Sequence, residues 1–200
     1  MQHHHLHFRI SRFYFIYYFF VGAFVPYWGL YLQAEQLSAA DIGILMSLFQ
    51  VSRIFAPNFW GWLADHTERR TVWIKLNTLL GLLGFVAVFW AHGFWGLFFV
   101  MAALSLFTSS TLPLSESLTL AHLATTNGHY SRIRMWGSLG FIVAAVILGF
   151  LIDGFGIKSL LWFVLAVQLC LYVLTHTLPE AKVEPHHTDH FSVWKIIRNP

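Results

Sequence analysis

Long apolar stretches dominate this sequence, and they constrain its fold more than any other feature. A helix that spans a bilayer needs about 20 mainly apolar residues, and six segments have that length and character. These segments are residues 13–32, 40–64, 71–91, 94–121, 134–152 and 157–178. Each segment is about twice as long as a barrel strand and lacks the strand's alternation of polar and apolar residues. The sequence therefore predicts an all-α membrane protein, a bundle of six transmembrane helices.

The composition excludes most soluble function classes. Of the 200 residues, 57% are apolar and 10% are charged, whereas soluble domains carry about 25% charged residues. The 12 Lys and Arg residues lie mostly in short loops between the apolar segments, so we expect no nucleic-acid partner. The sequence shows one cysteine, Cys170, no cluster of metal ligands and no nucleophile motif. We therefore expect no metal, no cofactor and no enzymatic activity.

The basic residues indicate how the bundle is oriented. Ten of them lie before the first segment, between segments two and three, between four and five, or after the sixth, whereas Lys158 alone lies on the other side. Cytoplasmic loops carry the excess of Lys and Arg, so both termini should be cytoplasmic. We expect a multi-pass plasma-membrane protein, in the bacterial inner membrane. Residues 179–200 are predicted to form a cytoplasmic linker and the start of a further helix.

Glu116 and Arg134 are the first candidates for a solute site. A charge at the centre of a membrane helix costs about 2.5–3.5 kcal/mol, so such residues usually face the bundle interior. Both residues lie a similar distance from the turn between their helices, so they should lie at similar depth. A pair between them would be either a structural tie or part of a solute site, since a guanidinium fork binds carboxylates or hydroxyls.

The sequence next to Glu116 admits two interpretations. Ser105, Ser109, Pro113 and Glu116 recur at helical spacing and share one face. A polar face that ends in an acid suits the wall of an aqueous cavity. The alternative is that the Glu116 carboxylate simply reaches the cytoplasmic surface. We favour the cavity.

Arg53 lies near the middle of the second segment and has two open interpretations. It contributes to the solute site, or it bonds to backbone carbonyls that Pro57 leaves unpaired. The aromatic run Tyr14–Phe20 is interpreted as lipid-facing surface and packing rather than a substrate cage, and Ser38 as an N-cap of the second helix. Several glycines are predicted to permit close helix approach, namely Gly81, Gly84, Gly137, Gly140 and Gly149.

Between the second and third segments, residues 61–70 read Gly-Trp-Leu-Ala-Asp-His-Thr-Glu-Arg-Arg. They resemble the signature loop of the major facilitator superfamily, Gly-x-Leu-Ala-Asp-Arg-x-Gly-Arg-Arg. The resemblance departs at His66, which replaces a basic residue, and at Glu68, which replaces a glycine. In that family the aspartate helps to latch the cytoplasmic ends of two helix bundles. The resemblance therefore implies a gating role for Gly61, Asp65, Arg69 and Arg70.

Residues 22–28 and 130–140 resemble the lactose permease and phenylpropionate permease group of that superfamily. In the lactose permease branch of that group, the glutamate of a Pro-x-x-Glu and the second arginine of an Arg-x-Arg hold the sugar. Glu116 precedes Arg134 by 18 residues, the same spacing. Phe141 falls where the lactose permease branch has a stacking tryptophan. An arginine at the position of Arg53, in the second helix, resembles the phenylpropionate permease branch. The resemblance implies a substrate site that contains Glu116, Arg134, Phe141 and Arg53, to which Tyr27 of the first helix is added.

Transporters of this kind have twelve helices in two halves around a midplane site. The resemblance thus implies that this chain is the N-terminal half and that its partners are a C-terminal six-helix half, the lipid bilayer, a small-molecule substrate and protons. We expect a proton-coupled symporter that works by alternating access. An aromatic carboxylate such as 3-phenylpropionate is favoured, with a sugar or a nucleoside as alternatives. A different class also stays open, in which the chain is a non-transporting remnant or a membrane sensor.

Overall fold

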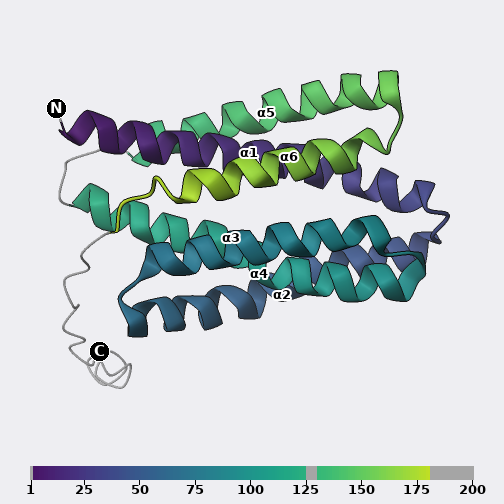
Figure 1. The fold of residues 1–200 in the computed structure, drawn as a ribbon, viewed down its shortest axis with the longest axis horizontal. Helices are drawn as coiled ribbons and strands as arrows, with labels where there is room; N and C mark the ends of the chain where they lie inside the picture. The colour runs from purple at the N-terminus through teal and green to yellow at the C-terminus, as the bar shows by residue number, and fades with distance from the viewer. Residues whose placement is uncertain (1, 125–129, 181–200) are drawn as a thin grey trace, which may run out of the picture.

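The computed structural model describes residues 2–124 and 130–180, and its regular elements there are all helical. The elements are α1 (Gln2–Ala34), α2 (Ala39–Thr67), α3 (Arg70–Ala87), the short 3₁₀ helix η1 (Val88–Trp90), α4 (Gly93–Ala124), α5 (Tyr130–Phe155) and α6 (Ser159–Thr175). They form an elongated bundle of roughly parallel rods (Figure 1). The predicted all-α class is confirmed, and the described residues contain the six expected helices.

The helices follow the apolar segments but continue beyond most of them. Within the described residues, five spans are long and apolar enough to cross a membrane, and α6 is a shorter apolar helix of 17 residues. At about 1.5 Å per residue, α6 extends over about 26 Å, close to the hydrocarbon thickness. α1 and α5 begin earlier than their apolar segments because polar residues continue a helix as readily as apolar ones. Of the expected linker, residues 181–200 lie outside the described part of the chain.

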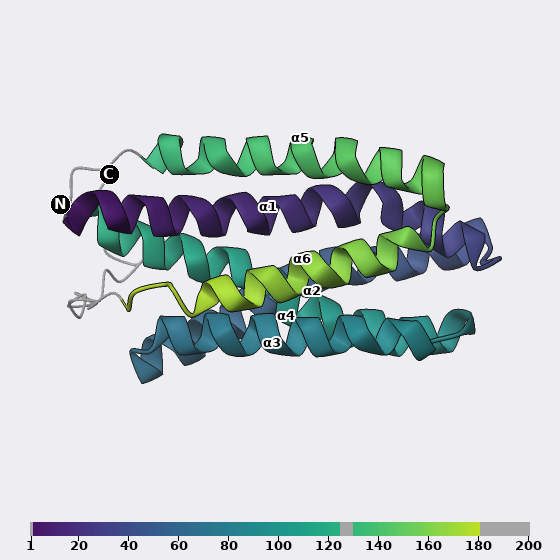
Figure 2. The same ribbon diagram turned by 45° about the horizontal axis from the view of Figure 1, so that its top comes forward.

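The chain runs up and down the bundle, so the start of α1, the α2–α3 turn and the end of α6 lie at one end (Figure 1). α1 packs along α5, and α2 packs along α4. α6 contacts both α1 and α3, and α3 also packs on α4, so α3 and α6 join the two pairs. Figure 2 shows α5 and α1 along one edge and α3 along the other, with α6 between them. Contacts between α1 and α2, and between α4 and α5, are sparse.

Glycines set the distance between α1 and α5. A Cβ atom on Gly22 would overlap the backbone of Phe141, and one on Gly140 would overlap the Phe15 carbonyl. At Gly137, a Cβ would meet the ring of Tyr18. Small residues of this kind let membrane helices approach backbone to backbone. The predicted close approach at Gly137 and Gly140 is confirmed, and it brings the tyrosines of α1 next to the start of α5.

The lipid-facing interpretation of the aromatic run is wrong for several of its members. Tyr14, Tyr17 and Phe20 are buried, because α5 and α6 pack along α1. The packing part of the interpretation holds for these three rings. The predicted N-cap of α2 is confirmed as well: the Ser38 hydroxyl accepts from the Asp41 amide at 3.1 Å, and the Asp41 carboxylate accepts from the Ser38 amide at 3.3 Å.

Candidate functional site

Glu116 of α4 and Arg134 of α5 form an ion pair. Nη1 of Arg134 donates to Oε1 of Glu116 at 2.6 Å, and the exposed fractions of the two side chains are 47% and 31%. The pair therefore lies on an accessible face of this bundle and not inside its core. The residues that the sequence placed at similar depth are brought together in the structure.

Tyr130 completes this cluster. Its hydroxyl donates to Oε1 of Glu116 at 2.9 Å and accepts from Nη1 of Arg134 at 3.2 Å. The Arg134 guanidinium also lies over the ring of Tyr18, 5.4 Å from its centroid, an arrangement that stabilises a cation. The sequence interpretation missed both tyrosines. Tyr130 precedes Arg134 by one helical turn, so i, i+4 spacing was the available signal.

Removing the Tyr130 hydroxyl should weaken this cluster without disturbing the fold. A hydrogen bond contributes about 0.5–1.5 kcal/mol net, and more when a partner is charged. We therefore expect Tyr130→Phe to lower the apparent substrate affinity of the full-length protein about 5- to 10-fold. The phenyl ring keeps its edge contact with Tyr14, whose centroid is 6.4 Å away. The measurement is the KM of uptake, with Tyr172→Phe on α6 as the matched control. An unchanged KM would show that the hydroxyl does not act on the site.

The polar face of α4 does not form one continuous cavity wall. Ser105 is fully buried, and its hydroxyl lies 2.6 Å from that of Ser52 in α2. The Ser109 hydroxyl oxygen is also buried, whereas Pro113 is exposed. The cavity-wall interpretation is therefore wrong for Ser105, which joins α4 to α2. Helical spacing identified the face but could not tell which part a neighbouring helix covers.

Arg53 is exposed at the centre of α2. Its Nη1 atom donates to Oε1 of Gln50 at 3.4 Å, one turn earlier on the same helix. The ion pairs found in the described residues join Arg70 to Asp65 and Arg134 to Glu116, and Arg53 belongs to neither. Among the described residues, Arg53 makes no hydrogen bond to a carbonyl near Pro57, so that alternative is not supported.

Phe141 and Tyr27 lie farther along the α1–α5 pair. Phe141 is half-buried, two turns beyond Arg134 on the same side of α5. The Tyr27 hydroxyl donates to the Ala145 carbonyl at 2.7 Å and so connects α1 to α5. Neither residue is hydrogen-bonded to the Glu116 cluster within the described segments. Their substrate contacts remain predictions.

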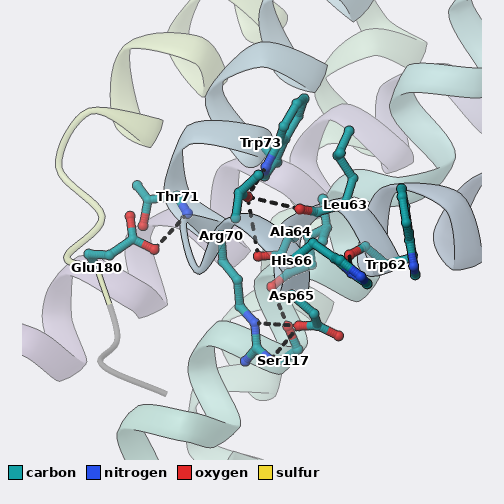
Figure 3. A network of polar contacts seen from close by, with 12 residues as sticks. Trp62, Leu63, Ala64, Asp65, His66, Arg70, Thr71, Trp73, Ser117 and Glu180 are labelled. Carbon is teal, nitrogen blue, oxygen red and sulfur yellow. Dashed lines mark hydrogen bonds and ion pairs between the residues drawn. The ribbon is translucent and has the colours of Figure 1, made fainter. Parts of the chain in front are cut away.

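The turn between α2 and α3 contains a second ion pair (Figure 3). Arg70 approaches Oδ1 of Asp65 with Nη2 at 2.8 Å and Nε at 3.3 Å. Arg70 is largely covered and Asp65 largely exposed, with side-chain exposures of 16% and 61%. Arg69 is exposed at the N-cap position of α3, and Gly61 is half-buried with open space at its Cα. Asp65 and Arg70, two of the four predicted gating residues, are thus in contact.

The same turn is connected to the chain that follows α6. Oε1 of Glu180 accepts from the backbone amide of Thr71 at 3.1 Å, in the first turn of α3 (Figure 3). The first amides of a helix have no partner within it and carry partial positive charge, so a carboxylate there is stabilising. The Trp73 indole donates to the Thr67 hydroxyl at 2.6 Å and closes the turn from the other side. The sequence interpretation missed Glu180.

Glu68 adopts the backbone conformation that a glycine would favour. Its φ is +53°, in the left-handed region, at the C-cap of α2. This conformation costs a residue with a side chain roughly 1–2 kcal/mol. A glycine at this position avoids that cost. Part of the gain in stability is lost, because glycine also increases the conformational entropy of the unfolded chain. We therefore expect Glu68→Gly to stabilise the protein by about 0.5–1 kcal/mol, measured as a higher thermal midpoint in detergent. Glu68→Ala is the control, because it removes the carboxylate but retains the strain; an equal gain in both variants would contradict this explanation.

A comparison with protein-family models decides the classification. The model described as the MFS_1 like family matches residues 7–199, nearly the whole chain. The chain belongs to the major facilitator superfamily. This result confirms the resemblance drawn from the α2–α3 turn.

Relatives and solved structures agree with this membership. The chain is 41% identical to a maltose permease from Geobacillus stearothermophilus over 143 residues, which cover 70% of this chain and 36% of that protein. It is 28% identical to a probable 3-phenylpropionic acid transporter from Escherichia coli (strain K12) over 190 residues, 92% of this chain and 50% of that one. The crystal structure of the nucleoside transporter NupG matches with a TM-score of 0.82 at 20% identity, over 97% of this chain and 48% of its own.

This superfamily member spans half or less of the length of these relatives. It has the fold of one half of a major facilitator transporter and is a multi-pass membrane protein. The family and its relatives are transporters and not enzymes. In the described residues there is no group of three or more side chains that could hold a metal ion.

Proposed function

We propose that this chain forms the N-terminal half of a proton-coupled symporter that imports a small organic solute by alternating access. The observation that carries the proposal is the cluster of Glu116, Arg134 and Tyr130. It places a carboxylate, a guanidinium and a hydroxyl on an accessible face of helices that cross the membrane. Ionisable residues in such helices usually serve solute or proton pathways. Phe141, Arg53 and Tyr27 complete the proposed substrate site.

The proposed orientation has both termini in the cytoplasm. The α2–α3 turn, the start of α5 and the start of α1 lie at one end of the bundle (Figure 1), and these parts carry most of the described basic residues. In this orientation Asp65 and Arg70 are cytoplasmic, together with Gly61 and Arg69. Their proposed role is to latch this half against a C-terminal six-helix half. Asp65 is suited to such a latch because most of its side chain is exposed.

The favoured substrate is an aromatic carboxylate similar to 3-phenylpropionate. Two observations support it: the relative named for that acid matches 92% of this chain, and the exposed Arg53 supplies a positive charge. A sugar is the nearest alternative, because the maltose permease is more similar in sequence over the part that it matches. A nucleoside is the third, because one sequence relative, 29% identical over 72% of this chain, is named a putative nucleoside transporter and the fold matches that of NupG.

The test is uptake of radiolabelled 3-phenylpropionate, maltose and uridine into cells that express the full-length gene, with and without a proton uncoupler. We expect the carboxylate to accumulate and the uncoupler to abolish that accumulation. Uptake that is indifferent to the uncoupler contradicts symport. A full-length product that inserts into the membrane but transports none of the three solutes favours the second class of function, a remnant or a sensor.

A further inference from the structure

The two arginines of the proposed site are not equivalent. We infer that Arg53, and not Arg134, binds the carboxylate group of the substrate. This inference rests on the proposed function and specifies which side chain recognises the charge of the solute. Three features of the structure carry it: the partners of Arg134, the partners of Arg53, and the side of α2 from which Arg53 projects.

Arg134 is already neutralised. Its guanidinium contacts the Glu116 carboxylate at 2.6 Å, the Tyr130 hydroxyl at 3.2 Å and the face of Tyr18. A second carboxylate at Arg134 would lie next to Glu116, and like charges at such a distance repel each other strongly where water is scarce. An anion could bind there only after Glu116 was protonated or displaced. The cluster as it stands suits hydroxyl groups better than carboxylates.

Arg53 has no comparable partner. Its contact in the described residues is the neutral amide oxygen of Gln50, at the long distance of 3.4 Å. Arg53 is also the central residue of α2, which runs from Ala39 to Thr67, so about 21 Å of helix separates it from either end. A guanidinium at that depth costs several kcal/mol unless a charge or water compensates it. A substrate carboxylate would supply that compensation.

Arg53 does not point toward the apolar, exposed side of α2. Val51, Phe55 and Trp62 form that side and are each exposed by about half. At about 100° per residue, Arg53 lies roughly 160–180° away from all three around the helix axis. Arg53 therefore projects away from the exposed apolar side of α2, and not toward the acyl chains.

The chemistry of Arg53 and Gln50 matches a carboxylate. A guanidinium offers two parallel N–H donors to the two carboxylate oxygens, and such charge-assisted pairs are roughly twice as strong as neutral ones. The Gln50 oxygen contacts Arg53 only at 3.4 Å, so the fork stays available to a carboxylate. A neutral sugar or nucleoside would leave the charge of Arg53 uncompensated. This site therefore selects a monocarboxylate over a neutral solute of the same size.

The test compares an anionic ligand with its neutral isostere. Binding of 3-phenylpropionate and 3-phenylpropionamide is measured on the purified full-length transporter, as wild type and as Arg53→Met, Arg53→Lys and Arg132→Met. Arg132 is an exposed arginine at the start of α5 and serves as the matched control. We expect Arg53→Met to weaken carboxylate binding at least about 10-fold and amide binding less than about 2-fold. Arg53→Lys should restore part of the loss, and Arg132→Met should change neither affinity.

Each other outcome overturns the inference in a recognisable way. Equal losses for the carboxylate and the amide would assign Arg53 a structural role. Unchanged carboxylate binding in Arg53→Met would show that another group, such as an acid of the C-terminal half, pairs with Arg53. A wild-type protein that transports maltose or uridine but no carboxylate would also overturn it, while the proposed transport function would stand. Failure of the proposed function itself is distinct, because then no solute in the panel is transported.

Discussion

Replacing Glu116 with glutamine, or Arg134 with alanine, is expected to abolish uptake while the protein still inserts into the membrane. Either change leaves the other charge without its partner and removes one of the two charged partners of the Tyr130 hydroxyl. Truncating one member of a hydrogen-bonded charge pair commonly costs 2–5 kcal/mol in binding. Because both side chains are partly exposed, we take the lower part of that range, which corresponds to a loss of about 30- to 100-fold. A loss of that size leaves uptake close to background.

The measurement is initial uptake per amount of transporter in the membrane, quantified by immunoblot. Asp153→Asn is the matched control, because Asp153 is an exposed acid near the opposite end of α5. It should keep uptake close to wild type. Normal transport in both Glu116→Gln and Arg134→Ala would remove the pair from the substrate site and leave it as a structural tie between α4 and α5.

Substituting leucine for Gly22 or Gly140 is expected to have the second large effect, on folding rather than on transport chemistry. A Cβ at either position overlaps a backbone atom of the facing helix, and backbone cannot rotate away as a side chain can. The helices would have to separate along the most extensive contact in the bundle, that of α1 with α5. Overpacking costs about 1–3 kcal/mol even where neighbours can relax. We expect each variant to give little or no monodisperse full-length protein after extraction.

Gly29→Leu provides the control on the same helix. A Cβ at Gly29 meets no atom within 4 Å, so a side chain there should be accommodated. Its yield in size-exclusion chromatography and its thermal midpoint should stay near those of the wild type. A Gly140→Leu variant with wild-type yield and midpoint would mean that α1 and α5 are not packed backbone to backbone.

Much of this architecture could be read from the sequence because the bilayer restricts the alternatives. With water absent, a spanning segment must satisfy its own backbone, so a long apolar run is a helix. The pairing of Glu116 with Arg134 was predictable for a related reason. Two antiparallel helices joined by a short turn place residues equidistant from that turn at one depth. Ser38 was predictable as an N-cap because the first amides of a helix have no partner within the helix. A serine hydroxyl just before the helix can accept a hydrogen bond from one of them.

Other features depend on which helices become neighbours, and periodicity does not contain that information. Ser105 and Glu116 share one face of α4, yet α2 covers Ser105 and leaves Glu116 accessible. The aromatic run of α1 looked lipid-facing because nothing in the sequence shows that α5 and α6 pack on it. The bond from Glu180 to Thr71 joins residues 109 positions apart, and no local pattern predicts such a contact.

That last bond has a mechanical consequence. The chain that leaves α6 is fastened a second time, at the first turn of α3, beside the turn that holds the Asp65–Arg70 pair. A connecting segment that is held at two points moves less freely than a segment that is held at one. A displacement of Glu180 is therefore transmitted directly to the first turn of α3, next to the Asp65–Arg70 pair, as well as to α6.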